Sequence, residues 1–137
     1  MLKIVRAAVG IVVGYALMVV LITLVQEGWF GGVQYGRSSW GVLLAAGALT
    51  ALSAAIGGTV ATIISLATGR AAAVLMSSVV VVETTVLVTT GRVAGPLWFD
   101  LMGSASLIVS ILAAAELCLR WPQLGMRQPA AHVTTAR

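Results

Sequence analysis

Few residues of this sequence could do chemistry, and one of them lies in an unusual place. Glu83 is in the middle of VVVVETTVLVTT at 79–90, a stretch otherwise fit for hydrocarbon. A charged side chain at the centre of a membrane-spanning helix costs about 2.5–3.5 kcal/mol on insertion scales. Such a residue is expected to face protein, and an intramembrane ionisable group is by default a functional candidate. We therefore take Glu83 as the candidate intramembrane functional residue.

Three roles remain open for Glu83. The favoured interpretation is a structural hydrogen bond, in which a protonated Glu83 donates to a backbone carbonyl or to Thr50, Ser53 or Ser106 on a neighbouring helix. The alternatives are binding of a proton or cation, and contact with a partner subunit or lipid. The sequence places no intramembrane lysine, arginine or histidine that could pair with Glu83.

The other three carboxylates lie near predicted helix ends, where structural roles are expected. Glu116 precedes Arg120 by four residues, a spacing at which side chains on one helix can pair. Asp100 lies near the start of the last predicted helix, where the helix dipole favours an anion and where Arg92 is a possible partner. Glu27 ends the first predicted helix.

No residue set resembles an active site, so we expect no enzymatic activity and no bound cofactor or metal. There is one cysteine, Cys118, and one histidine, His132, which is in the polar C-terminal segment. Neither an internal disulfide nor a two-histidine haem site can be built from this chain alone. The basic residues are scattered beside apolar segments, a pattern that does not predict nucleic-acid binding.

The elements that must position Glu83 are predicted from composition. The chain has 137 residues, of which 60% are hydrophobic and 9% are charged, whereas soluble domains carry roughly 25% charged residues. Four apolar segments, at about 7–25, 41–67, 71–90 and 97–119, approach or exceed the roughly 20 residues that a spanning helix needs. The sequence predicts an all-α, antiparallel four-helix transmembrane domain over 1–121 and a flexible tail over 122–137.

The distribution of basic residues predicts the orientation of this bundle. The N-terminus, the second connection and the tail share one side and carry six of the eight basic residues, and the other side carries Arg37 and Arg92. By the positive-inside rule both termini are cytoplasmic, in a multi-pass protein of the bacterial inner membrane. Trp29, Trp40 and Trp98 are expected to anchor the outer interface, and Trp121 the inner one. The first outer loop could lie on the membrane surface or dock a partner through Trp29, Phe30 and Tyr35.

Small residues predict how the helices pack, because transmembrane helices associate where their backbones can approach closely. In the second span the small residues fall on one side of the helix and the large ones, such as Leu52 and Ile56, on the other, so the small side should meet other helices. The first span has a GxxxG pair. The residues expected in helix packing are Gly10, Gly14, Gly47, Ala54, Gly58, Gly103, Ser106 and Ser110. These stripes could serve packing within the bundle or between subunits.

Two short motifs give the chain a family likeness. The run GGTVATIISLATGRA at 57–71 ends the second span in a basic turn, and PLWF at 96–99 opens the fourth. With these motifs the chain resembles a loose group of small, uncharacterised bacterial four-helix membrane proteins. The resemblance implies topology alone, since the group has no assigned chemistry. Small multidrug transporters carry their essential glutamate in the first helix, whereas the first span here has no acidic residue.

We therefore expect a small polytopic membrane protein without catalytic activity. It would act as an accessory or structural component through helix–helix contacts, in the lipid bilayer and without nucleic acid. It could assemble as a homo-oligomer or within a larger membrane complex. The alternative is a small oligomeric transporter or channel, in which Glu83 binds a proton or cation.

Overall fold

Four α-helices and one short π-helical segment make up most of the part of the chain that the structure describes. The computed structural model describes residues 2–65, 68–92 and 95–125. The helices are α1 (Leu2–Thr23), α2 (Trp40–Ser65), α3 (Gly69–Thr89) and α4 (Leu97–Gly125), and a π-helical segment, η1 (Leu24–Trp29), continues α1. Each of the four helices is long and apolar enough to cross a membrane. The predicted all-α architecture of four packed, potentially membrane-spanning helices is confirmed.

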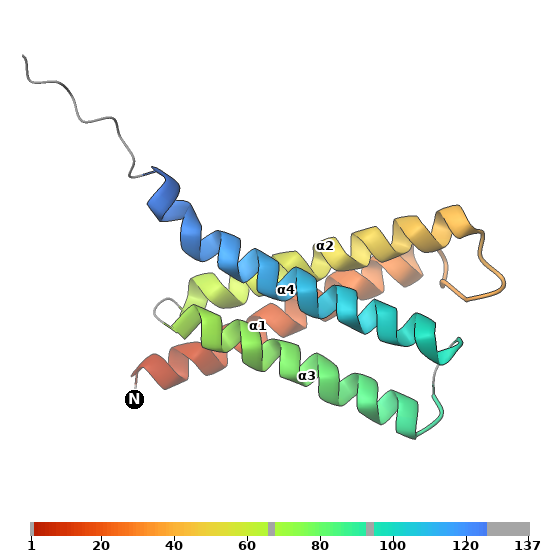
Figure 1. Cartoon of the computed structure of the whole chain (residues 1–137), viewed down its shortest axis with the longest axis horizontal. Coiled ribbons are helices and arrows are strands. Elements are labelled where there is room, and N and C mark those ends of the chain that lie inside the picture. Colours follow the sequence, from red (N-terminus) through yellow and green to blue (C-terminus); the bar gives the residue numbers. More distant parts are fainter. Residues whose placement is uncertain (1, 66–67, 93–94, 126–137) are drawn as a thin grey trace, which may run out of the picture.

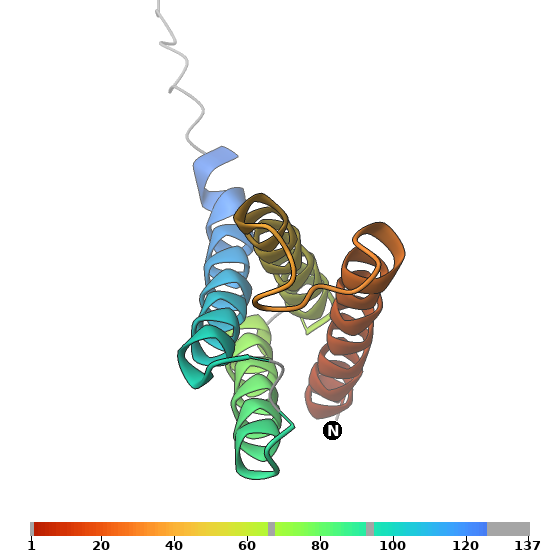
Figure 2. The same ribbon diagram turned by 90° about the vertical axis from the view of Figure 1, so that its right-hand side faces the viewer.

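The helices alternate in direction and form an open bundle (Figures 1 and 2). Helix α1 packs most extensively against α2, and α4 packs against both α2 and α3. Among the four α-helices, the contact between α1 and α3 is the smallest in the described part of the chain. In the view of Figure 2 these two helices stand apart at the end nearer the viewer. The bundle is therefore closed through α2 and α4 and comparatively open between α1 and α3.

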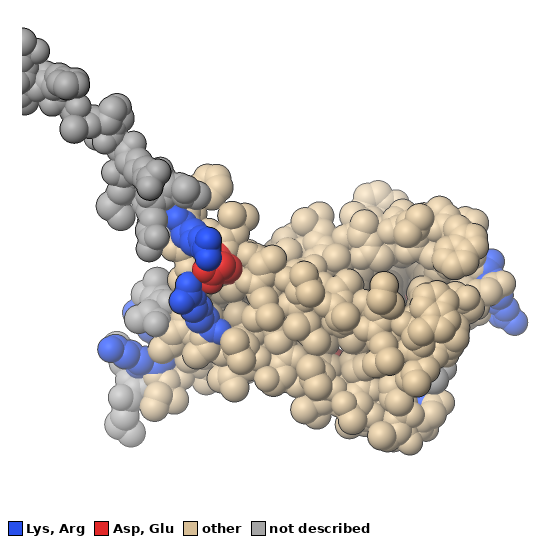
Figure 3. Space-filling view, in the orientation of Figure 1, with Lys and Arg blue, Asp and Glu red and all other residues tan. Residues whose placement is uncertain are grey.

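Charged side chains on the face shown in Figure 3 gather at the ends of the bundle, and the surface between them is uncharged over most of its area. One end is formed by the start of α1, the start of α3 and the C-terminal part of α4, which carry Lys3, Arg6, Arg70 and Arg120. Arg37 and Arg92 lie in the connections at the other end. This charge distribution is the one expected for helices that cross hydrocarbon.

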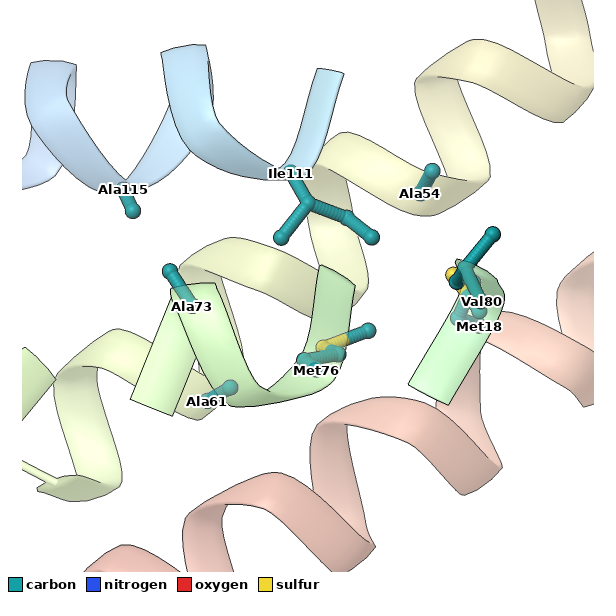
Figure 4. Close-up of a cluster of buried hydrophobic side chains, with 8 residues drawn as sticks. All are labelled: Met18, Ala54, Ala61, Ala73, Met76, Val80, Ile111 and Ala115. Atoms are coloured by element: carbon teal, nitrogen blue, oxygen red, sulfur yellow. The ribbon is translucent and has the colours of Figure 1, made fainter. Parts of the chain in front are cut away.

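The core contains small residues and a few larger ones from all four helices (Figure 4). Met18, Met76 and Ile111 are the largest apolar side chains that are fully buried. Alanines fill most of the remaining positions, namely Ala54, Ala61, Ala73 and Ala115. Because these side chains are short, the helices approach one another closely, as is usual where lipid provides no hydrophobic driving force between helices.

Helices α1 and α2 cross through the GxxxG pair of α1. A Cβ atom on Gly14 would lie 2.6 Å from the carbonyl oxygen of Gly57, and a Cβ on Gly57 would lie 2.6 Å from the carbonyl oxygen of Gly14. Gly10, one turn earlier, faces Ala61 and Ser65 just as closely. Gly10 and Gly14 are thus used within the chain, where side chains larger than hydrogen would push the two backbones apart.

The small side of α2 is its buried side, which includes Ala54, Gly57 and Gly58, whereas Leu52 and Ile56 are exposed. On α4 Ser110 is half-buried. Gly47, Gly103 and Ser106 are exposed on the single chain, and no atom of another helix lies within 4 Å of a Cβ built on either glycine. A packing role for these three residues between subunits stays a prediction. The core side of α4 instead carries Ile111 and Ala115, displaced around the helix from the predicted stripe. A small side chain permits helix contact but does not require it.

Some boundaries also differ from the predicted spans, and α1 already begins at Leu2. The first helical stretch continues through η1 to Trp29, where the Phe30 amide bonds the Val25 carbonyl at 3.3 Å, the spacing of a π-helix. At the other end of the chain α4 continues to Gly125, three residues beyond Pro122. A proline removes one backbone donor, so a helix can include it at some cost near its end. The rest of the predicted flexible tail, residues 126–137, lies outside the described residues.

Candidate functional site

Glu83 lies two-thirds of the way along α3 and is exposed on the single chain. The hydroxyl of Tyr15 on α1 donates a hydrogen bond of 2.5 Å to Glu83 Oε2. At 1.5 Å rise per residue, Tyr15 is roughly 18 Å and Glu83 roughly 21 Å along the helix axis from the start of its span, so both lie well inside a hydrocarbon layer about 30 Å thick. This Tyr15–Glu83 pair is the candidate functional site.

The close crossing of α1 and α2 positions Tyr15. Tyr15 directly follows Gly14, whose backbone contact with Gly57 fixes the position and rotation of α1 at this level. Met18, one turn further, is buried in the core. Residues three apart on a helix share a face, so the core contact of Met18 turns Tyr15 toward the edge of α1 that faces α3. Tyr15 itself is half-buried and packs against the core cluster.

Contacts to α4 position Glu83 from the opposite side. Val80, one turn before Glu83, is buried in the core. The hydroxyl of Thr84, the next residue, lies 2.7 Å from the hydroxyl of Ser104 on α4. These contacts hold one side of α3 against α4 and leave Glu83 on the side that faces α1. The pair thus adds a hydrogen bond to the contact between α1 and α3.

The hydrogen-bond partners predicted for Glu83 are engaged elsewhere. The Ser53 hydroxyl donates to the Leu49 carbonyl at 2.8 Å, and the Ser106 hydroxyl to the Gly103 carbonyl at 2.8 Å. The Thr50 hydroxyl accepts a long hydrogen bond of 3.5 Å from the Gln26 amide. A structural hydrogen bond to a neighbouring helix was expected, but its partner is Tyr15. Tyr15 could have been noticed in the sequence, because it has the one tyrosine hydroxyl within the four apolar segments.

The other carboxylates are outside this pair. Glu116 accepts from Arg120 at 2.8 Å, as its spacing predicted, and also from two nitrogens of Arg70 at 2.9 and 3.1 Å. This Arg70–Glu116–Arg120 cluster joins α3 to α4 at one end of the bundle. The expected pair of Asp100 with Arg92 is not present among the described residues, where Asp100 Oδ2 is buried without a hydrogen-bond partner.

The predicted interfacial tryptophans all lie at helix ends and are exposed. Trp29 ends η1, Trp40 begins α2, Trp98 is in the first turn of α4, and Trp121 is near the end of α4. Tyr35 of the first loop contacts Trp40 and Trp98 edge to face, with centroid distances of 6.4 and 5.7 Å. Tyr35 therefore packs between the starts of α2 and α4. The position of the four tryptophans at the membrane interfaces stays a prediction.

A shallow apolar groove runs between α2 and α4, well away from Glu83. Its volume is about 570 Å³. It is lined by Leu52, Ala55, Ile56, Thr59, Val60, Ala114, Leu117, Cys118 and Trp121. With so few polar atoms, this groove suits a lipid acyl chain and offers nothing that would bind a polar substrate.

The Tyr15–Glu83 pair can hold a proton or a hydrogen-bond donor. Among the described residues no three histidine, cysteine, aspartate or glutamate side chains are close enough to hold a metal ion.

The chain was compared with known proteins at three levels. No family model, no curated protein and no solved structure matches it. The four candidate spans support a small four-span membrane protein, and no family is identified for the chain.

Proposed function

We propose that the chain is a non-catalytic component of a membrane assembly, which acts through contacts between its helices and those of another membrane protein. The observation that carries this proposal is the exposure of Glu83 within the membrane-spanning part of α3. A polar group at this depth is expected to face protein, and on the single chain one side of it has no protein cover. A neighbouring transmembrane helix would provide that cover.

The proposal includes a topology and a location. Both termini would be cytoplasmic, because the end of the bundle that carries Lys3, Arg6, Arg70 and Arg120 is the more basic one. The membrane would be the inner membrane of a bacterium. Helices of this length and hydropathy suit that setting, and the lipid bilayer would cover the exposed leucine and valine side chains of all four helices.

Native mass spectrometry tests this function. The tagged chain would be extracted from its own membrane in a mild detergent, and its mass would be measured under conditions that preserve assemblies. We expect a companion protein at fixed stoichiometry, reduced or lost when Glu83 is replaced by leucine. A lone monomer in both variants would contradict the proposal, as would a homo-oligomer without a companion.

A second candidate function, binding of a proton or cation, is favoured by the direct hydrogen bond between Tyr15 and Glu83. In this alternative the chain would work as an oligomeric transporter or channel. Proton flux into proteoliposomes, measured with a pH-sensitive dye, separates the two functions. If the chain transports protons, Glu83→Gln should abolish the proton flux, because the glutamine side chain cannot take up or release a proton. If the chain acts only through helix contacts, the native chain should show no proton flux.

A further inference from the structure

Glu83 lies where α1 and α3 meet, with exposed valines of both helices nearby. On α3, Val79 and Val86 lie one turn before and one turn after Glu83 and are exposed. On α1, Val12 and Val19 flank Tyr15 in the same way and are also exposed. The Tyr15–Glu83 pair therefore lies among exposed valines on a surface formed by α1 and α3, which we call the α1–α3 surface.

The hydrogen bonds available within the chain do not satisfy Glu83. A carboxylate can accept about four hydrogen bonds, and Tyr15 is its one partner among the described residues. The nearby hydroxyls of α3 are committed to their own helix: Ser78 donates to the Val74 carbonyl and Thr85 to the Val81 carbonyl. Lipid acyl chains have no donors. Apart from the Tyr15 hydroxyl, the described residues thus offer Glu83 no hydrogen-bond donor on the α1–α3 surface.

A second copy of this chain would bring no basic side chain to that depth. Within residues 2–65, 68–92 and 95–125, the lysines and arginines lie near the ends of the helices or in the connections, far from the middle of the spans. A symmetric contact between two α3 helices would bring two Glu83 side chains together, an arrangement that like charges oppose unless they share a proton. A basic side chain that pairs with Glu83 would therefore come from a different protein.

We propose that the α1–α3 surface binds a transmembrane helix of another protein that carries a lysine or arginine at the middle of its span. That basic side chain would pair with Glu83, and the exposed valines of α1 and α3 would pack along the partner helix on either side of the pair. Intramembrane charges are paired with one another in this way because each alone is costly in hydrocarbon. This inference rests on the proposed function and names the chemistry of the partner.

Designed helices can test the proposal without the natural partner. The probe is a synthetic leucine–alanine helix with one central lysine, and its matched control has leucine at that position. Each peptide, labelled at one terminus, would be reconstituted into phosphatidylcholine vesicles with the full chain labelled at Cys118, and association would be followed by resonance energy transfer. We expect the lysine helix to bind at least tenfold more tightly than the leucine helix.

Two variants assign this preference to Glu83. Glu83→Gln should abolish the preference for lysine, and because glutamine still accepts a hydrogen bond from Tyr15, the fold should be retained, as circular dichroism would check. Glu116→Gln removes a carboxylate outside the α1–α3 surface and should leave the preference for the lysine helix unchanged. Equal binding of the two peptides would overturn the proposal, and so would Glu83-dependent self-association of the chain at the same dilution. A companion found by mass spectrometry together with equal peptide binding would leave the proposed function intact and refute this inference alone.

Discussion

Helix α1 makes two contacts that differ in kind. Against α2 it makes a close, apolar crossing in which Gly14 and Gly57 bring the two backbones together. Against α3 it makes a small contact whose polar part is the hydrogen bond from Tyr15 to Glu83. The first contact depends on close approach of the two backbones, whereas the second includes a hydrogen bond between two polar side chains.

The difference separates what holds the bundle together from what is available for function. Close packing is a major source of helix association in lipid, while a hydrogen bond between transmembrane helices is worth on average only about 0.6 kcal/mol. The α1–α2 crossing can therefore maintain the fold without the α1–α3 pair. If the fold does not need Glu83, an ionisable side chain in hydrocarbon is a cost that folding alone does not explain. Its presence then indicates a role in function.

The largest expected effect comes from breaking the α1–α2 crossing. Gly14→Leu would force a side chain into the carbonyl of Gly57 and into Ala61, both within 2.7 Å of the first added atom. Overpacking of this kind costs about 1–3 kcal/mol and occasionally more, and we expect the upper end of that range because backbone must move. Reversible unfolding in mixtures of dodecylmaltoside and sodium dodecyl sulfate, followed by circular dichroism, measures the loss.

Gly47→Leu is the matched control for Gly14→Leu. A Cβ on Gly47 meets no atom within 4 Å, and the residue is exposed on α2. The same chemical change there should alter the unfolding free energy by no more than about 0.5 kcal/mol, as is usual for surface positions. Equal destabilisation by the two leucines would show that the loss does not come from the α1–α2 crossing.

The comparison also shows how far the sequence could predict the molecule. Hydropathy and length predicted four helices, and the segregation of small from large residues predicted the buried side of α2. The carboxylate inside an apolar span identified Glu83. Each of these follows from local sequence, since apolar length and helical period are properties of one segment at a time.

The partner of Glu83 was not predictable in the same way. Its identity depends on the rotation of α1 about its axis and on its height relative to α3, and both are determined by the contact of Gly14 with α2. For α4 the stripe through Gly103 and Ser106 did not indicate which side of the helix faces the core of the single chain, because in lipid both small and large side chains can face outward. The second ion pair of Glu116, with Arg70, likewise depends on where α3 begins relative to α4.

A smaller effect should follow from removing the polar α1–α3 contact. Tyr15→Phe deletes the hydroxyl that donates to Glu83 and keeps the ring that packs on the core. We expect a loss of about 0.6 kcal/mol and at most about 1.7 kcal/mol of unfolding free energy, the range measured for hydrogen bonds between transmembrane helices. The same detergent titration measures it. A loss as large as that of Gly14→Leu would contradict the view that the pair is not needed for the fold.

The smallest effect should come from the polar contact on the other side of α3. Thr84 and Ser104 lie 2.7 Å apart, but the Thr84 hydroxyl also reaches the Val80 carbonyl at 2.8 Å and the Ser104 hydroxyl reaches the Asp100 carbonyl at 2.9 Å. Each hydroxyl has one proton. The hydroxyl that donates to the other one therefore cannot at the same time donate fully to the backbone carbonyl of its own helix. When Thr84→Val removes one hydroxyl, Ser104 keeps a backbone acceptor, whereas Tyr15→Phe leaves Glu83 without a partner among the described residues. Thr84→Val should therefore cost less than Tyr15→Phe in the same titration, and the reverse order would mean that the polar contact to α4, and not the one to α1, holds α3 in place.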